Sequence, residues 1–349
     1  MSTMLLSKVD ITTILRYNSL VMREPILRML QQKEHVSGET LAHSLGISRT
    51  AVWKHVNILR RMGYEINSSP HFGYSFIKSP DLLFPDEINC GLSTSFMGKR
   101  ILYSTEVTST QDVAGKAARR GEEEGTIAIA EKQSRGRGRK GRHWISPIHS
   151  GIYLSVILRP SLRPDRALQL PLIAGVAVIR AIKATTKIVP TLKWPNDIMV
   201  NGKKAGGILA EISSDTDEIH YIVLGIGLNV NVLKSHFPSP LQETVTSLMD
   251  ISGHHVSRVR LVRCLLSELE SIYLEFLTSG FDSIRKEWLS SNNTINSEIK
   301  AVSGPETIEG KAIDIDKDGF LLVKEPNGHI TKIISGDVLP PTKKQERIP

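Results

Sequence analysis

Hydrophobic residues recur at helical spacing in the first part of the chain. Positions 21–30 repeat apolar side chains every three or four residues, and positions 37–63 then predict two more short helices in quick succession. Ser37 and Ser48 stand where helix N-caps are expected, and Gly46 supplies the turn between the two helices. This spacing predicts a helix-turn-helix.

The second of these two helices is expected to have an apolar side and a polar, basic side. Val52, Val56 and Leu59 recur on one side and predict the buried face. The opposite face fits the major groove of DNA, with polar side chains against base edges and cations against phosphates. The alternative is a three-helix interaction module with a solvated basic face. The candidate DNA-binding residues are Arg49, Thr50, Trp53, Lys54 and Asn57.

A short hairpin is predicted directly after the helices. Residues 64–77 alternate in two runs on either side of a Ser-Ser-Pro turn, which is typical of a wing. The stretch 78–88 carries two prolines and no long periodicity, so it reads as a linker. We therefore expect an N-terminal extension over residues 1–20 and a winged helix-turn-helix domain over 21–79.

Strands and helices mix in the region 80–292, which we expect to be one α/β domain. The polar run "STQ" at 109–111 precedes a helical stretch, and by itself it reads most simply as an N-cap. Residues 126–133 alternate as a strand that is expected to end at Gln133. The segment "SRGRGRKGRHW" follows, and three interpretations stay open for it: a polyphosphate or nucleotide site, a solvated basic loop, or a segment that binds RNA without sequence preference.

Two later segments of this domain carry further candidate chemistry. In "KWPNDIMVNGKK", Asn196 and Asp197 precede a tight "NG" turn and two lysines, and a carboxylate beside phosphates is a natural Mg²⁺ ligand. In "YIVLGIGLNVN", aliphatic residues alternate with the small and amide residues from Gly225 to Asn231. One face of that strand is expected to be core, and the other to leave room for a flat ligand.

The C-terminal region is predicted to be a small all-β domain. Residues 293–341 contain short alternating runs separated by Gly, Asp and Asn turns, as in an SH3-like β-barrel. Residues 342–349 are expected to be a tail. The whole chain is thus predicted to be an α+β, multi-domain protein.

Bulk properties narrow the setting of the protein. The formal net charge is +8, which indicates an anionic partner, and the two cysteines are far apart and give neither a disulfide framework nor a zinc site. The first residues lack the pattern of a signal peptide, and the most apolar stretch, "LQLPLIAGVAVI", is too short to span a membrane. We expect a cytoplasmic protein without a membrane partner.

The motifs taken together resemble a known family. "GRGRKGRHW" after a strand, "KWPND" with a downstream lysine, and "GIGLNVN", in this order and spacing, are similar to the catalytic domain of biotin protein ligases. With the winged helix in front, the chain resembles the bifunctional ligases that also repress the biotin operon. The resemblance implies a central domain of the biotin/lipoate ligase type and covers about residues 21–341.

The resemblance implies a reaction and its residues. Biotin and ATP are joined to biotinyl-5'-AMP, with Mg²⁺ as cofactor and Asp197 as a metal ligand, and biotin then passes to a lysine of the biotin carboxyl carrier protein of acetyl-CoA carboxylase. Arg137, Arg139 and Lys204 are the implied catalytic residues. The implied biotin contacts are Ser109, Thr110, Gln111, Gln133, Arg137, Gly138, Arg139 and Lys204, and the implied nucleotide contacts are Arg139, Arg142, Trp144, Asn196 and Asn229.

Regulation is also implied by the resemblance. The chain loaded with biotinyl-5'-AMP is expected to form a homodimer that binds operator DNA. Two alternatives stay open, a ligase whose winged helix has lost operator binding and a regulator that senses a ligand without catalysis. Lys203, next to Lys204, is the competing candidate for the functional lysine.

Overall fold

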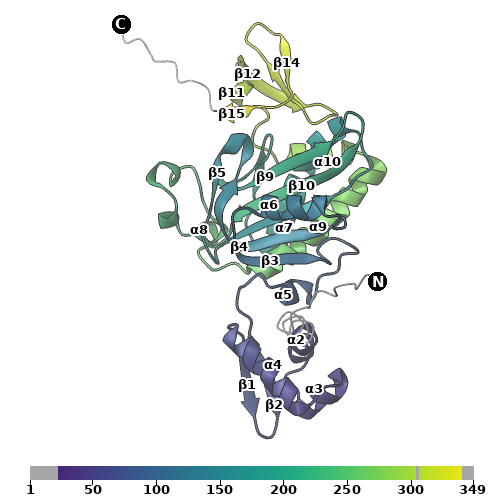
Figure 1. Ribbon diagram of the computed structural model, residues 1–349. Helices are drawn as coiled ribbons and strands as arrows, with labels where there is room; N and C mark the ends of the chain where they lie inside the picture. The colour runs from purple at the N-terminus through teal and green to yellow at the C-terminus, as the bar shows by residue number, and fades with distance from the viewer. Residues whose placement is uncertain (1–22, 304–305, 340–349) are drawn as a thin grey trace, which may run out of the picture. The chain divides into compact units, whose positions relative to one another are not determined.

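The computed structural model describes residues 23–303 and 306–339 and divides the chain into two compact units, 1–91 and 92–349 (Figure 1). The predicted extension and tail, together with the expected helix start at 21 and domain end at 341, lie outside the described residues. The finer boundaries at 79 and 292 stay predictions. Helix α5 continues the first unit beyond residue 79.

The first unit contains the predicted helices and hairpin. Its caps agree with the sequence: the Ser37 and Ser48 side chains accept hydrogen bonds from the amides of Thr40 and Ala51, and Gly46 has the left-handed φ of 63°. The elements are α2 (Arg23–Gln32), α3 (Gly38–Leu45), α4 (Arg49–Arg61), β1 (Glu65–Ser69), β2 (Gly73–Lys78) and α5 (Pro85–Asn89).

A single apolar cluster holds this unit together. Val52, Val56 and Leu59 of α4 are fully buried against α2 and α3, as the spacing predicted. Strands β1 and β2 pair antiparallel as a wing, and Val36 forms an isolated bridge with Tyr74 that ties the wing to the start of α3. The winged helix-turn-helix prediction is confirmed.

The second unit is organised around a mixed sheet of eight strands. The order is β3-β4-β6-β10-β9-β8-β7, with β5 paired to β4, and only β3 and β4 run parallel. The strands are β3 (Ile101–Val107), β4 (Ile127–Arg137), β5 (His143–Ser146), β6 (Gly151–Leu158), β7 (Thr191–Lys193), β8 (Asp197–Val200), β9 (Lys203–Ser214) and β10 (Ile219–Asn229).

Helices cover both faces of this sheet (Figure 1). Alanines of α6 (Thr110–Arg119) pack on Ala128, Ile157 and Val223, while Gly175 of α7 (Leu170–Thr185) lies against Ile208 on the opposite face. Helix α9 (Arg258–Ser279) packs against α7. Two shorter helices complete the unit, α8 (Leu248–Ser252) and α10 (Asp282–Ser290).

Two expectations for this unit need correction. Strand β4 does not end at Gln133 but continues to Arg137, because β5 pairs with it beyond that point. The helical segment Pro164–Thr185 is longer than the apolar stretch within it and is long and apolar enough to span a membrane, because a 3-10 turn leads directly into α7. Its most apolar window is 72% buried inside the protein, as in a core helix.

The C-terminal region is a five-stranded antiparallel sheet, as predicted for a small all-β domain. The strand order is β14-β13-β12-β11-β15, and alternate residues such as Ile299, Leu321 and Val323 are buried on one side. Its strands are β11 (Glu298–Ser303), β12 (Glu306–Ile315), β13 (Leu321–Lys324), β14 (Ile330–Ile333) and β15 (Asp337–Leu339).

Candidate active site

One cavity of about 290 Å³ opens on the face of the sheet that α6 shares. Strands β4, β5, β6, β8, β9 and β10 and the start of α6 supply its walls, and β15 closes one side. Every residue predicted to contact biotin, nucleotide or metal lines it: Ser109, Thr110, Gln111, Gln133, Arg137, Gly138, Arg139, Arg142, Trp144, Asn196, Asp197, Lys204 and Asn229.

The start of α6 and the end of β4 form one buried polar network. Ser109 caps α6, and the Gln133 side-chain oxygen accepts a hydrogen bond from the Thr110 amide at 2.8 Å. The Gln133 amide nitrogen donates to Ser146 Oγ at 2.9 Å, and Ser155 Oγ donates to Thr110 Oγ1 at 2.8 Å. The cap reading of "STQ" is correct, and the same cap fixes a wall of the cavity.

The space beside the glycines of β10 is occupied by protein side chains. A Cβ on Gly225 would lie 2.7 Å from Gln111 Oε1, and one on Gly227 would lie 2.8 Å from the Trp144 indole. The bare glycines thus leave room for Gln111 and Trp144, which line the cavity together with Gly225 and Gly227. Room for a flat ligand beside the same glycines stays a prediction.

Three buried polar atoms of the cavity have no hydrogen-bond partner among the described residues. They are Gln111 Oε1, Trp144 Nε1 and Asn229 Oδ1. A buried polar atom without a partner loses about 1–3 kcal/mol of solvation. A ligand with its own donors and acceptors would satisfy all three, so the cavity has the polarity of a binding site.

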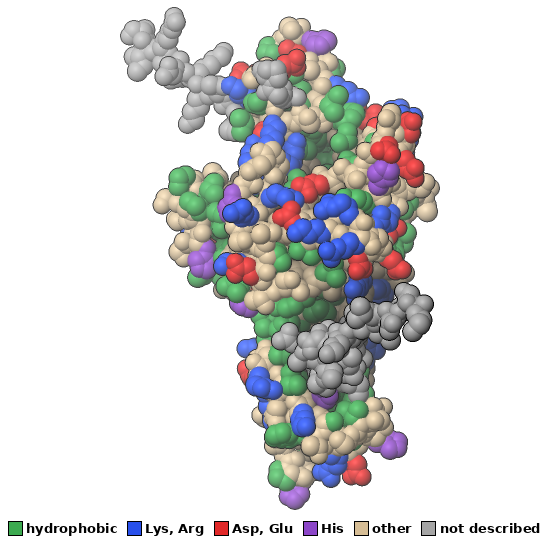
Figure 2. All heavy atoms as spheres, in the orientation of Figure 1, with side chains coloured by type: hydrophobic (Ala, Val, Ile, Leu, Met, Phe, Trp, Pro, Cys, Tyr) green, Lys and Arg blue, Asp and Glu red, His purple; other side chains and the backbone are tan. Residues whose placement is uncertain are grey.

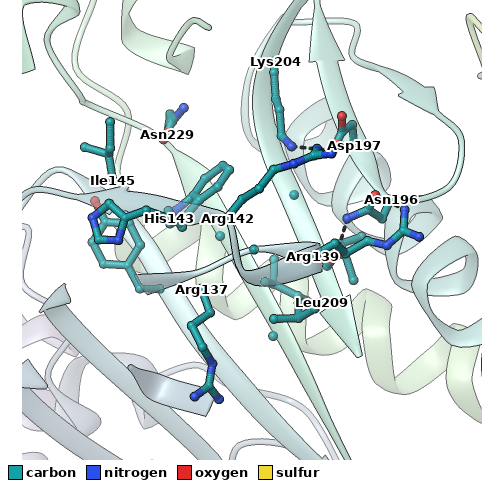
Figure 3. A pocket seen from close by; sticks show the side chains of 18 of the residues that line it. Arg137, Arg139, Arg142, His143, Ile145, Asn196, Asp197, Lys204, Leu209 and Asn229 are labelled. Carbon is teal, nitrogen blue, oxygen red and sulfur yellow. Dashed lines mark hydrogen bonds and ion pairs between the residues drawn. The ribbon is translucent and has the colours of Figure 1, made fainter. Parts of the chain in front are cut away.

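The β8–β9 hairpin brings a cation and a carboxylate to the opposite wall. Lys204 Nζ lies 2.5 Å from Asp197 Oδ1 and 5.6 Å from the centre of the Trp144 ring (Figure 3). Lys203 is not among the residues that line the cavity. Within the described residues no group of three or more His, Cys, Asp or Glu side chains forms a metal cluster.

The arginine-rich loop is held by the C-terminal sheet. Arg139 donates to Asn196 Oδ1 at 3.4 Å and to the Gly336 carbonyl at 3.1 Å (Figure 3). Lys140 donates to Asp337 at 3.1 Å, and Arg142 also pairs with that carboxylate. Sequence reasoning missed Gly336 and Asp337, because an acidic residue in a C-terminal strand carries no local sign of contact with a loop about two hundred residues earlier.

The electrostatics of this contact have identifiable causes. Burial lowers the pKa of Arg139, and the carboxylates of Asp337 and Asp197 oppose that shift. Burial alone would raise the pKa of Asp337, but the hydrogen bond from Lys140 and the charge of Arg142 outweigh it, so the pKa lies below its ordinary value. Figure 2 shows Lys and Arg side chains gathered among Asp and Glu on this face of the second unit.

Comparisons with known proteins agree with this geometry. Residues 102–229 match the biotin/lipoate A/B protein ligase family, residues 23–75 match an HTH domain, and residues 294–339 match the biotin protein ligase C-terminal domain. The chain is 39% identical to the bifunctional ligase/repressor BirA of Bacillus subtilis over 91% of this chain and 98% of the relative. This chain belongs to the biotin protein ligase family.

More distant members of the biotin protein ligase family are similar over most of the chain. The bifunctional ligase/repressor BirA of Escherichia coli is 31% identical over 90% of this chain and 95% of that protein. The biotin protein ligase from Aquifex aeolicus, solved in complex with biotin and ATP, superposes with a TM-score of 0.60 at 31% identity, over 69% of this chain and 98% of its own.

The HTH match falls on the helices whose outer face was predicted to bind DNA. Arg49, Thr50, Trp53 and Lys54 are exposed on α4, and Asn57 is half-buried with its side-chain oxygen accepting from Arg60 at 3.3 Å. Trp53 is 55% exposed, which is unusual for tryptophan in a folded domain. In this member of the biotin protein ligase family the basic face of α4 is therefore exposed to solvent.

Proposed function

We propose that the cavity binds biotin and ATP together and joins them, so that the chain acts as a biotin protein ligase and, through its winged helix, as a repressor. The observation that carries the ligase assignment is the cavity itself. It combines several cations, Arg139 and Lys204 among them, with three buried polar atoms that lack partners among the described residues. A ligand with one anionic end and one neutral, hydrogen-bonding end fits such a lining.

In the first step the carboxylate of biotin attacks the α-phosphorus of ATP. A bond forms between a carboxylate oxygen and the α-phosphorus. The bond between the α-phosphorus and the oxygen that bridges to the β-phosphorus breaks, and pyrophosphate leaves with that electron pair. Arg139 and Lys204 supply positive charge to the phosphate oxygens, which is the main lever for phosphoryl and nucleotidyl transfer. No general base is needed because a carboxylic acid is already ionised at neutral pH.

We propose that the neutral part of biotin binds beside the polar network between the start of α6 and the end of β4. Ser109, Thr110, Gln111, Gln133 and Gly138 line that wall, and the Gln111 oxygen without a partner is suited to accept a hydrogen bond from a ligand N–H. The nucleotide belongs on the other side. Its proposed contacts are Arg139, Arg142, Trp144, Asn196 and Asn229.

Mg²⁺ is proposed to enter with the ATP phosphates. Asp197 is partly exposed in the cavity, with Asn196 next to it in the chain. One carboxylate together with substrate phosphates is a normal Mg²⁺ environment, so these residues fit the ion. Mg²⁺ neutralises phosphate charge when bound, and Asp197 would then exchange its contact with Lys204 for the metal.

In the second step a lysine amine of the biotin carboxyl carrier protein attacks the biotinyl carbonyl. The new amide bond forms, the carbonyl–phosphate bond breaks, AMP leaves, and the amine loses its proton. The mixed anhydride would be hydrolysed in open water, so the site has to exclude water between the steps. The contacts of Arg139, Lys140 and Arg142 with Gly336 and Asp337 hold the loop beside the cavity, which supports this protective role.

Regulation is proposed to use the same intermediate. The loaded chain forms a homodimer, and two winged helices then meet a two-fold operator through the outer face of α4. Biotinyl-5'-AMP is the corepressor in this scheme. We place the protein in the cytoplasm without a membrane partner, in keeping with two cysteines that form no disulfide with each other and with its basic, proposed DNA-binding face.

Two measurements on the full chain test these proposals. Pyrophosphate release that requires both biotin and ATP is expected, and its absence would leave a ligand-sensing regulator as the better account. DNA selected from a random duplex library by the loaded chain should bind more tightly with biotinyl-5'-AMP than without it. Equal affinity in the two conditions would identify a ligase whose winged helix has lost operator control.

A further inference from the structure

The side chain of Arg137 is directed away from the reacting groups of the cavity. Its Nη1 lies 2.5 Å from Asp112 Oδ1, and its Nη2 lies 3.0 Å from Glu211 Oε2. Figure 3 shows the Arg137 guanidinium on the opposite side of the loop from Arg139 and Arg142. Two carboxylates thus share this one guanidinium, and a planar fork with several donors suits such a bridge.

The two carboxylates come from elements that build the cavity. Asp112 lies in the first turn of α6, directly after the residues 109–111 that form one wall, and it also accepts a hydrogen bond from Thr108 at 3.2 Å. Glu211 lies on β9, the strand that carries Lys204. Arg137 is the last residue of β4, and its side chain therefore connects that strand to α6 and β9. These two elements line the parts of the cavity where the two ends of the proposed ligand would bind.

Arg137 lies between two glycines, Gly136 and Gly138, so its ion pairs are the side-chain contacts that hold this part of the loop in place. Gly136 is packed so closely that a Cβ there would lie 2.8 Å from Ser146 Oγ and 2.9 Å from Gln133 Nε2. The backbone amide of Gly138 donates a hydrogen bond to the Arg142 carbonyl at 2.7 Å and so closes the turn of residues 138–142. Neither glycine has a side chain to fix the direction in which the loop leaves the sheet.

We propose that Arg137 is a positioning residue, and that Asp112 and Glu211 hold it so that Arg139 and Gly138 meet the ligand. This inference rests on the proposed function, since it assigns Arg137 to the shape of the site and not to contact with biotin. The expected consequence is weaker ligand binding with little change in turnover at saturation, because the groups near the reacting atoms are untouched.

The test compares Arg137→Met, the double variant D112N/E211Q, and the triple variant in the full chain. Calorimetry should show about three- to tenfold weaker biotin binding for the single and double variants, the scale of partly exposed ion pairs. The triple variant should bind no more weakly than Arg137→Met, because residues that act through one contact are not additive. At saturating biotin and ATP, the kcat of D112N/E211Q should stay within about twofold of the wild type.

Glu106→Gln is the matched control. It breaks the Lys132–Glu106 pair, which also involves β4 and whose side chains are 41% and 49% exposed, against 37%, 35% and 44% for Arg137, Asp112 and Glu211. This variant should bind biotin like the wild type. An equal loss in the control overturns the proposal, because the effect would then belong to the sheet in general.

Three other results also decide the matter. If D112N/E211Q binds biotin like the wild type while Arg137→Met loses far more than tenfold, Arg137 contacts the ligand directly and the positioning role is wrong. If the wild-type chain binds no biotin at all, the proposed function fails and this inference fails with it. Binding by the wild type, with unchanged binding by all three variants, rejects the inference alone.

Discussion

Two basic regions of this chain look alike in sequence and differ in structure. The outer face of α4 and the loop of residues 135–142 both concentrate cations, and either one would suit a polyanion. Arg49 and Lys54 of α4 form no ion pair within the described part of the chain and stand exposed on a helix capped by Ser48. Four of the loop cations, in contrast, are matched by carboxylates and carbonyls around a cavity: Arg137, Arg139, Lys140 and Arg142.

The difference separates two ways of binding an anion. Exposed cations on a rigid helix attract phosphates by releasing counterions, so their effect depends strongly on salt. Cations whose charge is already matched by fixed partners provide a shaped, partly dry site in which a small anion is oriented. Substitutions in the loop should therefore change the ligase reaction, and substitutions on α4 should change DNA binding. The largest effects are expected for the residues that line the cavity.

Lys204→Met should have the largest effect. It removes the cation that lies beside Asp197 and Trp144 at the proposed reacting centre. Loss of one group that stabilises developing charge lowers kcat by about 100- to 1,000-fold. Biotin- and ATP-dependent pyrophosphate release measures it, with Lys203→Met as the neighbour that does not line the cavity. Equal losses in both variants would mean that the structure does not distinguish the two lysines.

Arg139→Met should release the intermediate early. The variant loses contacts with Asn196 and the Gly336 carbonyl as well as the proposed contact with the phosphate. Hydrogen bonds to a charged group contribute about 1.5–3 kcal/mol, which corresponds to roughly 10- to 100-fold faster loss of biotinyl-5'-AMP. A filter assay with labelled biotin follows retention. Arg135→Met, an exposed cation of the same loop, should retain it like the wild type.

Lys54→Ala should affect DNA binding and leave the ligase reaction unchanged. Loss of one phosphate contact lowers the slope of log affinity against log salt by about 1 and weakens binding about fivefold at 0.15 M salt. Titration of the selected duplex at several salt concentrations measures both. Lys33→Ala, exposed on the same unit outside α4, is the control. An unchanged slope for Lys54→Ala would remove this lysine from the DNA interface.

Local features of both regions could be predicted from the sequence. Ser37, Gly46 and Ser48 cap their helices as expected, since caps depend on a few neighbouring residues. Alternation in β10 identified its aliphatic face, although both faces of that strand are buried, and the residues of the predicted site do line one cavity. Periodicity and local motifs therefore located the elements and a set of residues that lie together around this cavity.

Contacts between distant segments could not be predicted from the sequence. The continuation of β4 to Arg137 depends on its pairing with β5, and the space beside Gly227 is taken by Trp144 from another strand. Arg137 meets Glu211 across 74 positions, and Arg142 meets Asp337 across 195. No periodicity or local motif encodes such partners, because they arise only when the sheet and the C-terminal strands assemble.

The contact between the loop and Asp337 should give the smallest effect, and it tests whether the loop cations are neutralised as described. The Asp337 pKa lies below its ordinary value, so its contribution to stability is complete above the unfolded pKa of about 3.9 and is lost as the pH falls through the folded pKa. Asp337→Asn should lower the free energy of unfolding by about 0.5–1 kcal/mol at pH 7, the scale of a partly exposed ion pair. Urea unfolding should show a constant difference from pH 8 to about pH 5 that shrinks below about pH 4. A difference that persists at lower pH would mean that the carboxylate stabilises the loop by packing rather than by charge.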